Sequence, residues 1–128
     1  FRAVTGTEPA GFVAPAWLAT PALPPLLRRH GFAWTEDHAA VVDLSAGRAI
    51  AAPVITWATR TPLRRATSVA GTPLLLRLRR RSRVLRLAVH PLDFDHPRTV
   101  ASIRRVWSAA LRLGPQRWTE DVLVQRLA

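Results

Sequence analysis

The segment Arg86–Phe94, RLAVHPLDF, constrains the fold more than any other part of the chain, because an apolar strand runs directly into a histidine and then into a turn that carries a carboxylate. In open parallel sheets and barrels, reacting groups lie on the loops at the carboxyl ends of the strands, where the rigid sheet aims them into a shared crevice. His90 follows its strand in this way. The segment Gly11–Leu18, GFVAPAWL, has the same form, with Pro15 and Trp17 in its loop. The two segments together predict one site, in which both loops face a common cleft.

The other strands are predicted from short apolar or alternating runs that are bounded by turn residues. Two of these runs are joined by Ser45-Ala46-Gly47, which predicts a small hairpin. Because strands alternate with helices along the chain, we expect an α/β fold with a mostly parallel sheet. The expected strands are Gly11–Ala14, Phe32–Thr35, Val41–Leu44, Ala49–Ile50, Val54–Trp57 and Val84–Val89.

The first two helices are predicted from prolines near their starts and a glycine at a stop. The first lies within Thr20–Gly31, and the second begins at Thr61 and Pro62. Gly71 and Pro73 should bend or break this second helix, which then resumes to Arg81.

Two later helices follow the histidine loop. One begins at Pro97, with Asp95 or His96 as its cap, and ends at Gly114. The last begins at Thr119-Glu120-Asp121, where a cap and two acids oppose the positive end of the helix dipole.

The length of 128 residues allows one domain at most, and burying about two thirds of the unfolded surface is feasible at this size only if the fold closes on itself. A complete barrel needs about twice this length or more. The chain begins at Phe1 rather than at a methionine. We therefore expect it to be a piece of a longer protein.

The formal charge of +11 would ordinarily suggest nucleic acid or an anionic membrane surface as a partner. All 19 basic residues are arginine, however, and the chain is rich in alanine, leucine and proline, which is typical of the codon bias of a GC-rich genome. The absence of cysteine excludes disulfides and thiolate metal sites. No apolar run reaches the ~18 residues of a membrane span, and no signal peptide opens this stretch, so a cytoplasmic location is favoured.

The densest basic run, Arg77–Arg86, favours a different class of function, because a basic stripe can neutralise phosphates. We prefer to interpret it as a solvated helix face that leads into a buried strand, since it has no interleaved aromatic residues and no helix-turn-helix signature. A non-catalytic, Arg-rich domain that binds anions or nucleic acid is the alternative function. An enzyme-derived scaffold that has lost catalysis is a third.

FVAPAW in the first loop segment and LAVHPLD in the second resemble the third and fifth motifs of the NodB-homology polysaccharide deacetylases, in a bacterial branch with a proline-tryptophan loop. The intervening PVITWATRTPLRRATS and the trailing DFDHPRTVASIRRVW resemble that branch too, so the resemblance covers nearly the whole chain. It implies a partial (β/α) barrel of the NodB type, incomplete in this chain. Residues 1–128 would be the carboxyl-terminal portion of a single deacetylase domain.

Enzymes of this family open with a paired-aspartate motif and then a histidine pair, which together hold a divalent metal and supply the general base. Neither motif is present in this sequence. The resemblance implies a metal-dependent hydrolase that acts on carbon–nitrogen bonds other than peptide bonds and removes acetyl groups from a carbohydrate. The divalent metal, expected to be zinc, would have its ligands outside this chain, and the chain alone would be inactive. The expected partner is the acetylated carbohydrate, with no nucleic acid and no membrane span.

His90 has the place of the fifth-motif histidine, which by resemblance is the general acid that protonates the leaving amine. Imidazole suits this task because its unperturbed pKa is about 6.5. Asp93 is the second expected catalytic residue: either it accepts the other imidazole proton, or it is a turn former whose carboxylate bonds its own backbone. The set His90, Asp93, Asp95 and His96 matches no zinc pattern, so we expect no metal site in this chain.

Pro15 and Trp17 are the expected substrate-binding residues, because the resemblance makes Trp17 a wall of the pocket against the acetyl methyl or a sugar face. Trp57 stands at a strand end and is expected to line the same mouth, with Trp34 as a further candidate. Core packing is the alternative for each tryptophan. Family members commonly carry an arginine in the third motif that steadies the catalytic base, and FVAPAW has none.

Overall fold

The computed structural model describes residues 2–114 of the chain. These residues divide into two compact units, the first ending at Ala52 and the second beginning at Pro53. The helix predicted from Thr119 lies outside the described residues. No helix within residues 2–114 is both long enough and apolar enough to cross a membrane.

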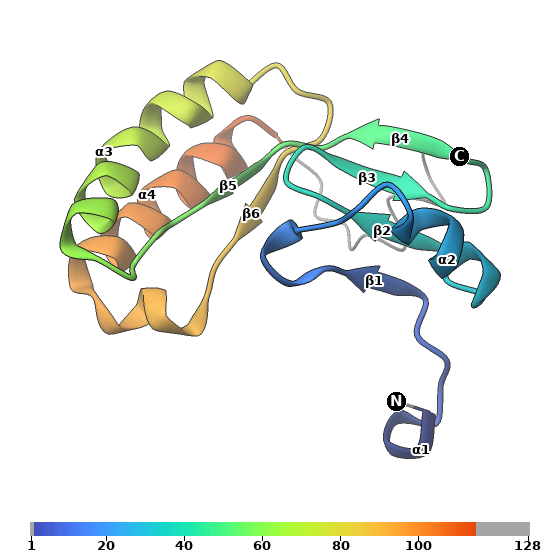
Figure 1. Cartoon of the computed structure of the whole chain (residues 1–128). Coiled ribbons are helices and arrows are strands. Elements are labelled where there is room, and N and C mark those ends of the chain that lie inside the picture. Colours follow the sequence, from blue (N-terminus) through green and yellow to red (C-terminus); the bar gives the residue numbers. More distant parts are fainter. Residues whose placement is uncertain (1, 115–128) are drawn as a thin grey trace. The chain divides into compact units, whose positions relative to one another are not determined.

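The first unit is built on a four-stranded sheet with short helices in its connections (Figure 1). Its elements are α1 (Arg2–Thr5), β1 (Gly11–Val13), the 3-10 helix η1 (Pro15–Trp17), α2 (Leu23–Arg29), β2 (Trp34–Glu36), β3 (Ala40–Asp43) and β4 (Arg48–Ala51). β1 pairs with β2 in parallel, whereas β2–β3 and β3–β4 are antiparallel. The predicted hairpin is thereby confirmed as β3 and β4. The expected mostly parallel sheet is wrong for this unit, because short connections join β2, β3 and β4 into a meander.

Close pairing of β1 with β2 depends on Gly11. It lies opposite Trp34 in the register, and a Cβ on Gly11 would overlap the Trp34 ring. A glycine is therefore needed for the indole to occupy this position. Buried Val41 and Leu44 form the core of this unit together with Leu27 of α2.

α2 begins later than predicted. Thr20 accepts a hydrogen bond from the Leu23 N–H in a turn, and the helix itself starts only at Leu23. The predicted stop at Gly31 is confirmed, because Gly31 has a φ of +79° in the left-handed region that glycine adopts without strain.

The second unit alternates strands and helices, as the sequence predicts. Its elements are β5 (Val54–Thr56), α3 (Pro62–Arg79), β6 (Arg86–Ala88), the 3-10 helix η2 (Pro91–Asp95) and α4 (Pro97–Arg112). β5 and β6 pair in parallel, so the parallel arrangement is confirmed for these strands. Figure 1 shows α3 and α4 side by side on one face of the two strands. The NodB-type partial barrel stays a prediction.

A buried apolar cluster joins these helices to the strands. It contains Ile55 of β5, Leu76 of α3, Val106 and Ala110 of α4, and Trp57 immediately after β5. Val106 and Ala110 lie four residues apart, which places both on one face of the helix. Burial of this face fixes α4 against β5, β6 and α3.

The sequence predicts that Gly71 and Pro73 bend or break the second helix, and the break is wrong, because α3 continues through Pro73. A proline within a helix leaves the carbonyl four residues earlier without its usual N–H donor. In α3 that carbonyl belongs to Val69, and the Thr72 hydroxyl donates to it at 3.3 Å. The side chain next to the proline therefore replaces the missing backbone hydrogen bond.

Candidate active site

His90 lies at the carboxyl end of β6, where the strand ends and η2 begins. Its backbone is extended, and its side chain is exposed. Parallel pairing of β6 with β5 brings the segment after β5 to the same end of the sheet. The structure therefore places His90 where the sequence predicts a reacting group to lie.

The Asp93 carboxylate holds the loop that carries His90. Asp93 is 0% exposed, and its Oδ2 accepts a hydrogen bond from the His90 backbone N–H at 2.7 Å. Its Oδ1 accepts from the Thr59 hydroxyl at 3.1 Å, and Thr59 lies shortly after β5. Neither bond goes to the imidazole ring, so of the two interpretations that the sequence left open, the structure shows the turn former. Asp93 positions the His90 backbone relative to the end of β5.

Trp57 is not an open pocket residue in this structure. It is 4% exposed and belongs to the buried cluster of the second unit. Its indole Nε1–H donates to the Ser102 Oγ at 3.1 Å, and the Thr72 hydroxyl lies 3.1 Å from the same oxygen. The sequence alternative of core packing therefore describes Trp57, since a side chain without free surface cannot contact a sugar.

The Pro15–Trp17 loop follows β1 as predicted and is fastened to the neighbouring strand. The Trp17 Nε1–H donates to Glu36 Oε1 at 3.0 Å, and Glu36 is the last residue of β2. Ala16 and Trp17 have φ values of +54° and +56°, in the left-handed region that costs residues other than glycine about 1 kcal/mol each. The indole–carboxylate hydrogen bond helps to keep the backbone in this costly conformation.

The sequence interpretation missed two residues, Glu36, which holds Trp17, and Thr59, which holds Asp93. Glu36 is buried and directly follows the predicted strand Phe32–Thr35, and an acid at a strand end is a signal that could have identified it. Thr59 gives no such signal, because its role depends on Asp93, which lies far along the chain.

The predicted residues fall into two groups. His90 and Asp93 come together in the second unit, and Pro15 and Trp17 lie in the first. The common cleft predicted for the two loops stays a prediction.

No group of three metal-ligating side chains is found among residues 2–114. His96, one of the four residues weighed as metal ligands from the sequence, contacts an arginine: the Arg65 Nη1 lies 2.9 Å from the His96 Nε2. The Asp93 oxygens receive the hydrogen bonds from Thr59 and His90. The residues around His90 therefore do not fit a metal site.

One carboxylate of the first unit has a clearly shifted pKa. The Ala46 N–H, followed by the Ser45 hydroxyl, lowers the pKa of Asp43 from its ordinary value by hydrogen bonding to the ionised form. The Ser45 N–H donates to the same oxygen at 3.0 Å. Asp43 thus closes the turn between β3 and β4.

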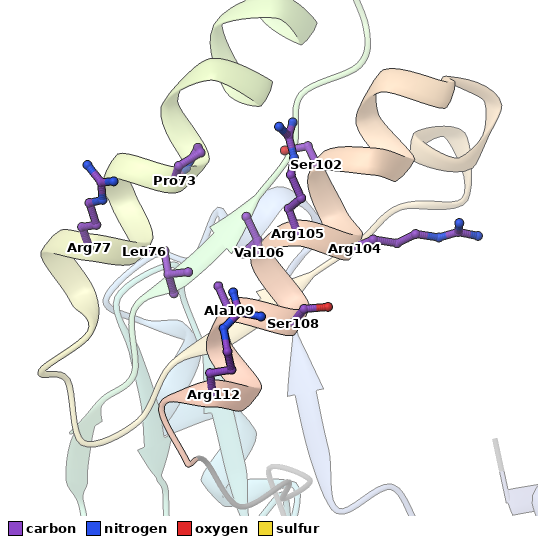
Figure 2. Close-up of a pocket in the computed structure, with 10 residues that line it drawn as sticks. All are labelled: Pro73, Leu76, Arg77, Ser102, Arg104, Arg105, Val106, Ser108, Ala109 and Arg112. Atoms are coloured by element: carbon purple, nitrogen blue, oxygen red, sulfur yellow. The ribbon is translucent and has the colours of Figure 1, made fainter.

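A separate cavity of about 600 Å³ lies between α3 and α4 (Figure 2). Leu76 and Val106 contribute apolar surface to its lining, and Arg77 and Arg105 are among the cations around it. None of the residues that line it is a predicted site residue. The cavity is therefore a second feature of this unit, distinct from the His90 loop.

No family model matches this chain, and no curated protein and no solved structure matches it significantly.

Proposed function

We propose that this chain is the carboxyl-terminal portion of a carbohydrate deacetylase of the NodB type, in which His90 is the general acid. The observation that carries the proposal is the exposed His90 side chain at the carboxyl end of a parallel strand, on a loop that the buried Asp93 carboxylate fastens. The resemblance of LAVHPLD and FVAPAW to family motifs supports it.

The proposed role of His90 is to donate a proton to the amine as it leaves the tetrahedral intermediate. An imidazole is suited to this role because its unperturbed pKa of about 6.5 lets it hold and release a proton near neutral pH. Asp93 contributes through the backbone: its bonds to the His90 N–H and to Thr59 restrict the loop. A restricted loop loses less entropy when the proton donor meets the substrate.

The proposed substrate contacts of this chain are Pro15 and Trp17. The Trp17 side chain is half-buried and is oriented by its hydrogen bond to Glu36. An indole held in this way can stack on the apolar face of a sugar or against an acetyl methyl group. Trp57 is not retained as a substrate contact, because it is buried in the core.

The divalent metal of the proposed enzyme, with zinc as the expected ion, has no fitting ligand set among residues 2–114. In such hydrolases the metal polarises the carbonyl and lowers the pKa of bound water. The roles proposed for this chain are limited to proton donation and substrate contact.

The test is His90→Asn in the full-length protein supplied with zinc, assayed on an acetylated amino-sugar oligomer. Loss of general acid catalysis should reduce kcat by about a hundredfold to ten-thousandfold, with a smaller change in KM. His30→Asn is the matched control, because His30 is also exposed and lies in the first unit. Trp17→Ala should instead raise KM more than it lowers kcat. A His90→Asn enzyme with the parent kcat would show that His90 is not the general acid.

A further inference from the structure

The two helices of the second unit carry an unbalanced charge. α3 and α4 contain eight arginines and no aspartate or glutamate. Codon bias explains why arginine replaces lysine, but it does not explain why acids are absent. Charges of one sign repel one another on adjacent helices, so this composition lowers the stability of the isolated unit unless a partner supplies the opposite charge.

Helix stability does not account for these arginines either. Cations are favourable at the carboxyl end of a helix, which fits Arg77, Arg79 and Arg112. Arg64 and Arg98, however, lie in the first turns of α3 and α4, where a cation opposes the helix dipole. An external anion near these positions would offset the unfavourable interaction with the dipole.

The arginines around the α3–α4 cavity lie on both helices. Figure 2 shows Arg77 on α3 and Arg105 and Arg112 on α4, with Leu76 between the two helices. All three side chains are exposed, so their positive charge faces solvent, where a ligand can reach it.

On α4 the arginines form a row. Arg98, Arg105 and Arg112 are spaced seven residues apart, which is close to two helical turns, so they lie along one side of the helix at intervals of about 10 Å. A row of this length matches an extended array of negative charges better than one small anion.

The exposed surface of α3 also carries apolar side chains. Leu63, Leu74 and Leu78 are 74%, 58% and 71% exposed. Their spacing of eleven and then four residues places them on one face of α3. The cavity between the helices adds apolar lining from Pro73 and Ala109. The exposed leucines of α3 and the exposed arginines of the two helices together define what we call the α3–α4 face: Leu63, Leu74, Leu78, Arg77, Arg98, Arg105 and Arg112.

We propose that the α3–α4 face docks on an anionic lipid bilayer. The arginines contact lipid phosphates, and the leucines enter the boundary between headgroups and acyl chains. Nucleic acid would satisfy the arginines, but it offers no apolar medium for three exposed leucines. A bilayer of anionic lipid satisfies both groups at once.

The test is binding of the purified chain to vesicles of phosphatidylglycerol and phosphatidylcholine, measured by co-sedimentation, with pure phosphatidylcholine vesicles in parallel. The chain should bind the anionic vesicles and not the neutral ones, and binding should weaken as salt is raised. Arg105→Gln combined with Arg112→Gln should reduce affinity by about tenfold or more, because each cation near an anionic surface contributes about fivefold. Arg28→Gln combined with Arg29→Gln removes the same charge from α2 and should change affinity much less.

A second pair of variants tests the apolar part of the proposal. Leu74→Gln combined with Leu78→Gln should also reduce affinity by about tenfold, because the leucines lose their favourable transfer into the lipid boundary. Val4→Gln combined with Leu18→Gln alters exposed apolar residues of the first unit and should leave binding unchanged. Circular dichroism establishes that each variant folds, which is expected because all the altered side chains are exposed.

Four results would overturn the proposal. The first is equal binding to neutral and anionic vesicles, or no binding to either. The second is an equal loss of affinity in the Arg105/Arg112 and Arg28/Arg29 variants, which would show that net charge alone explains vesicle binding. The third is parent affinity in the Leu74→Gln, Leu78→Gln variant, with tighter binding to duplex DNA than to vesicles, which would identify nucleic acid as the partner. The fourth is a dimer in sedimentation that this leucine variant abolishes while vesicle binding is absent, which would identify a second copy of the chain.

Discussion

The loops after β1 and β6 are built in the same way, yet they leave different groups available. Each loop contains a 3-10 helix that begins with a proline, and each is held through a buried carboxylate to the adjacent parallel strand or to the segment just after it. In the first unit the carboxylate is Glu36, and it engages the Trp17 side chain itself. In the second unit it is Asp93, and it engages the backbone of His90.

The difference separates two ways of preparing a residue for function. A side chain that is itself hydrogen-bonded, such as Trp17, has a fixed orientation and presents a constant surface. His90 is held only through its backbone N–H, so the position of its Cα is restricted while its side chain stays exposed. The first arrangement suits a wall against which a ligand packs, and the second suits a group that must exchange protons with a substrate and solvent.

The largest expected effect comes from removing the carboxylate of the second unit. Asp93→Ala should lower the free energy of unfolding by about 3 kcal/mol, because two hydrogen bonds to a charged acceptor are lost and the His90 N–H loses its acceptor. Urea denaturation followed by circular dichroism measures this change. Thr59→Val removes only the hydroxyl and should cost about 1 kcal/mol. Equal stability of Asp93→Ala and the parent would mean that the carboxylate does not fasten this loop.

The contribution of Asp93 could be predicted from the sequence only as one of two alternatives, and the reason is physical. A carboxylate three residues after His90 can reach the imidazole ring or the backbone N–H of that histidine at similar local cost. The structure favours the backbone because Thr59, far away in the sequence, takes the other oxygen. The hairpin of β3 and β4, in contrast, was predictable because its turn residues and apolar runs are neighbours in the chain.

Two further differences from the sequence prediction also arise from side-chain contacts that the local sequence pattern does not contain. α3 continues through Pro73 because the Thr72 hydroxyl bonds the Val69 carbonyl, which a rule based on proline alone does not include. Trp57 is buried because α3 and α4 cover it, and helix packing is not visible in the local strand-end pattern. Local signals therefore located the His90 and Trp17 loops, whereas tertiary contacts decided which side chains stay exposed.

The second prediction, of intermediate size, concerns the side chain that the first unit fastens. Trp17→Phe keeps an aromatic ring but removes the indole N–H, so one hydrogen bond to the Glu36 carboxylate is lost. We expect the free energy of unfolding to fall by about 1.5 kcal/mol, which is less than for Asp93→Ala. Glu36→Gln keeps an acceptor oxygen and should cost less than Trp17→Phe. If Trp17→Phe were more destabilising than Asp93→Ala, the Glu36 hydrogen bond would contribute more to stability than the Asp93 hydrogen bonds do, contrary to this prediction.

The smallest effect is expected from a third carboxylate, Asp43, which closes the turn between β3 and β4 without holding a candidate functional residue. Its pKa is lowered by hydrogen bonds from the Ala46 N–H and the Ser45 hydroxyl, so the folded state binds its proton less readily than the unfolded state does. The stability it contributes is fully present above the unfolded pKa of about 3.9 and is lost as pH falls through the lower, folded pKa. Urea midpoints measured between about pH 6 and pH 3 should therefore decline in the parent and decline less in Asp43→Asn, which cannot ionise. If the two proteins had parallel pH profiles, the Asp43 hydrogen bonds would contribute no acid-sensitive stability, and carboxylate fastening would be a property of the two strand-end loops alone.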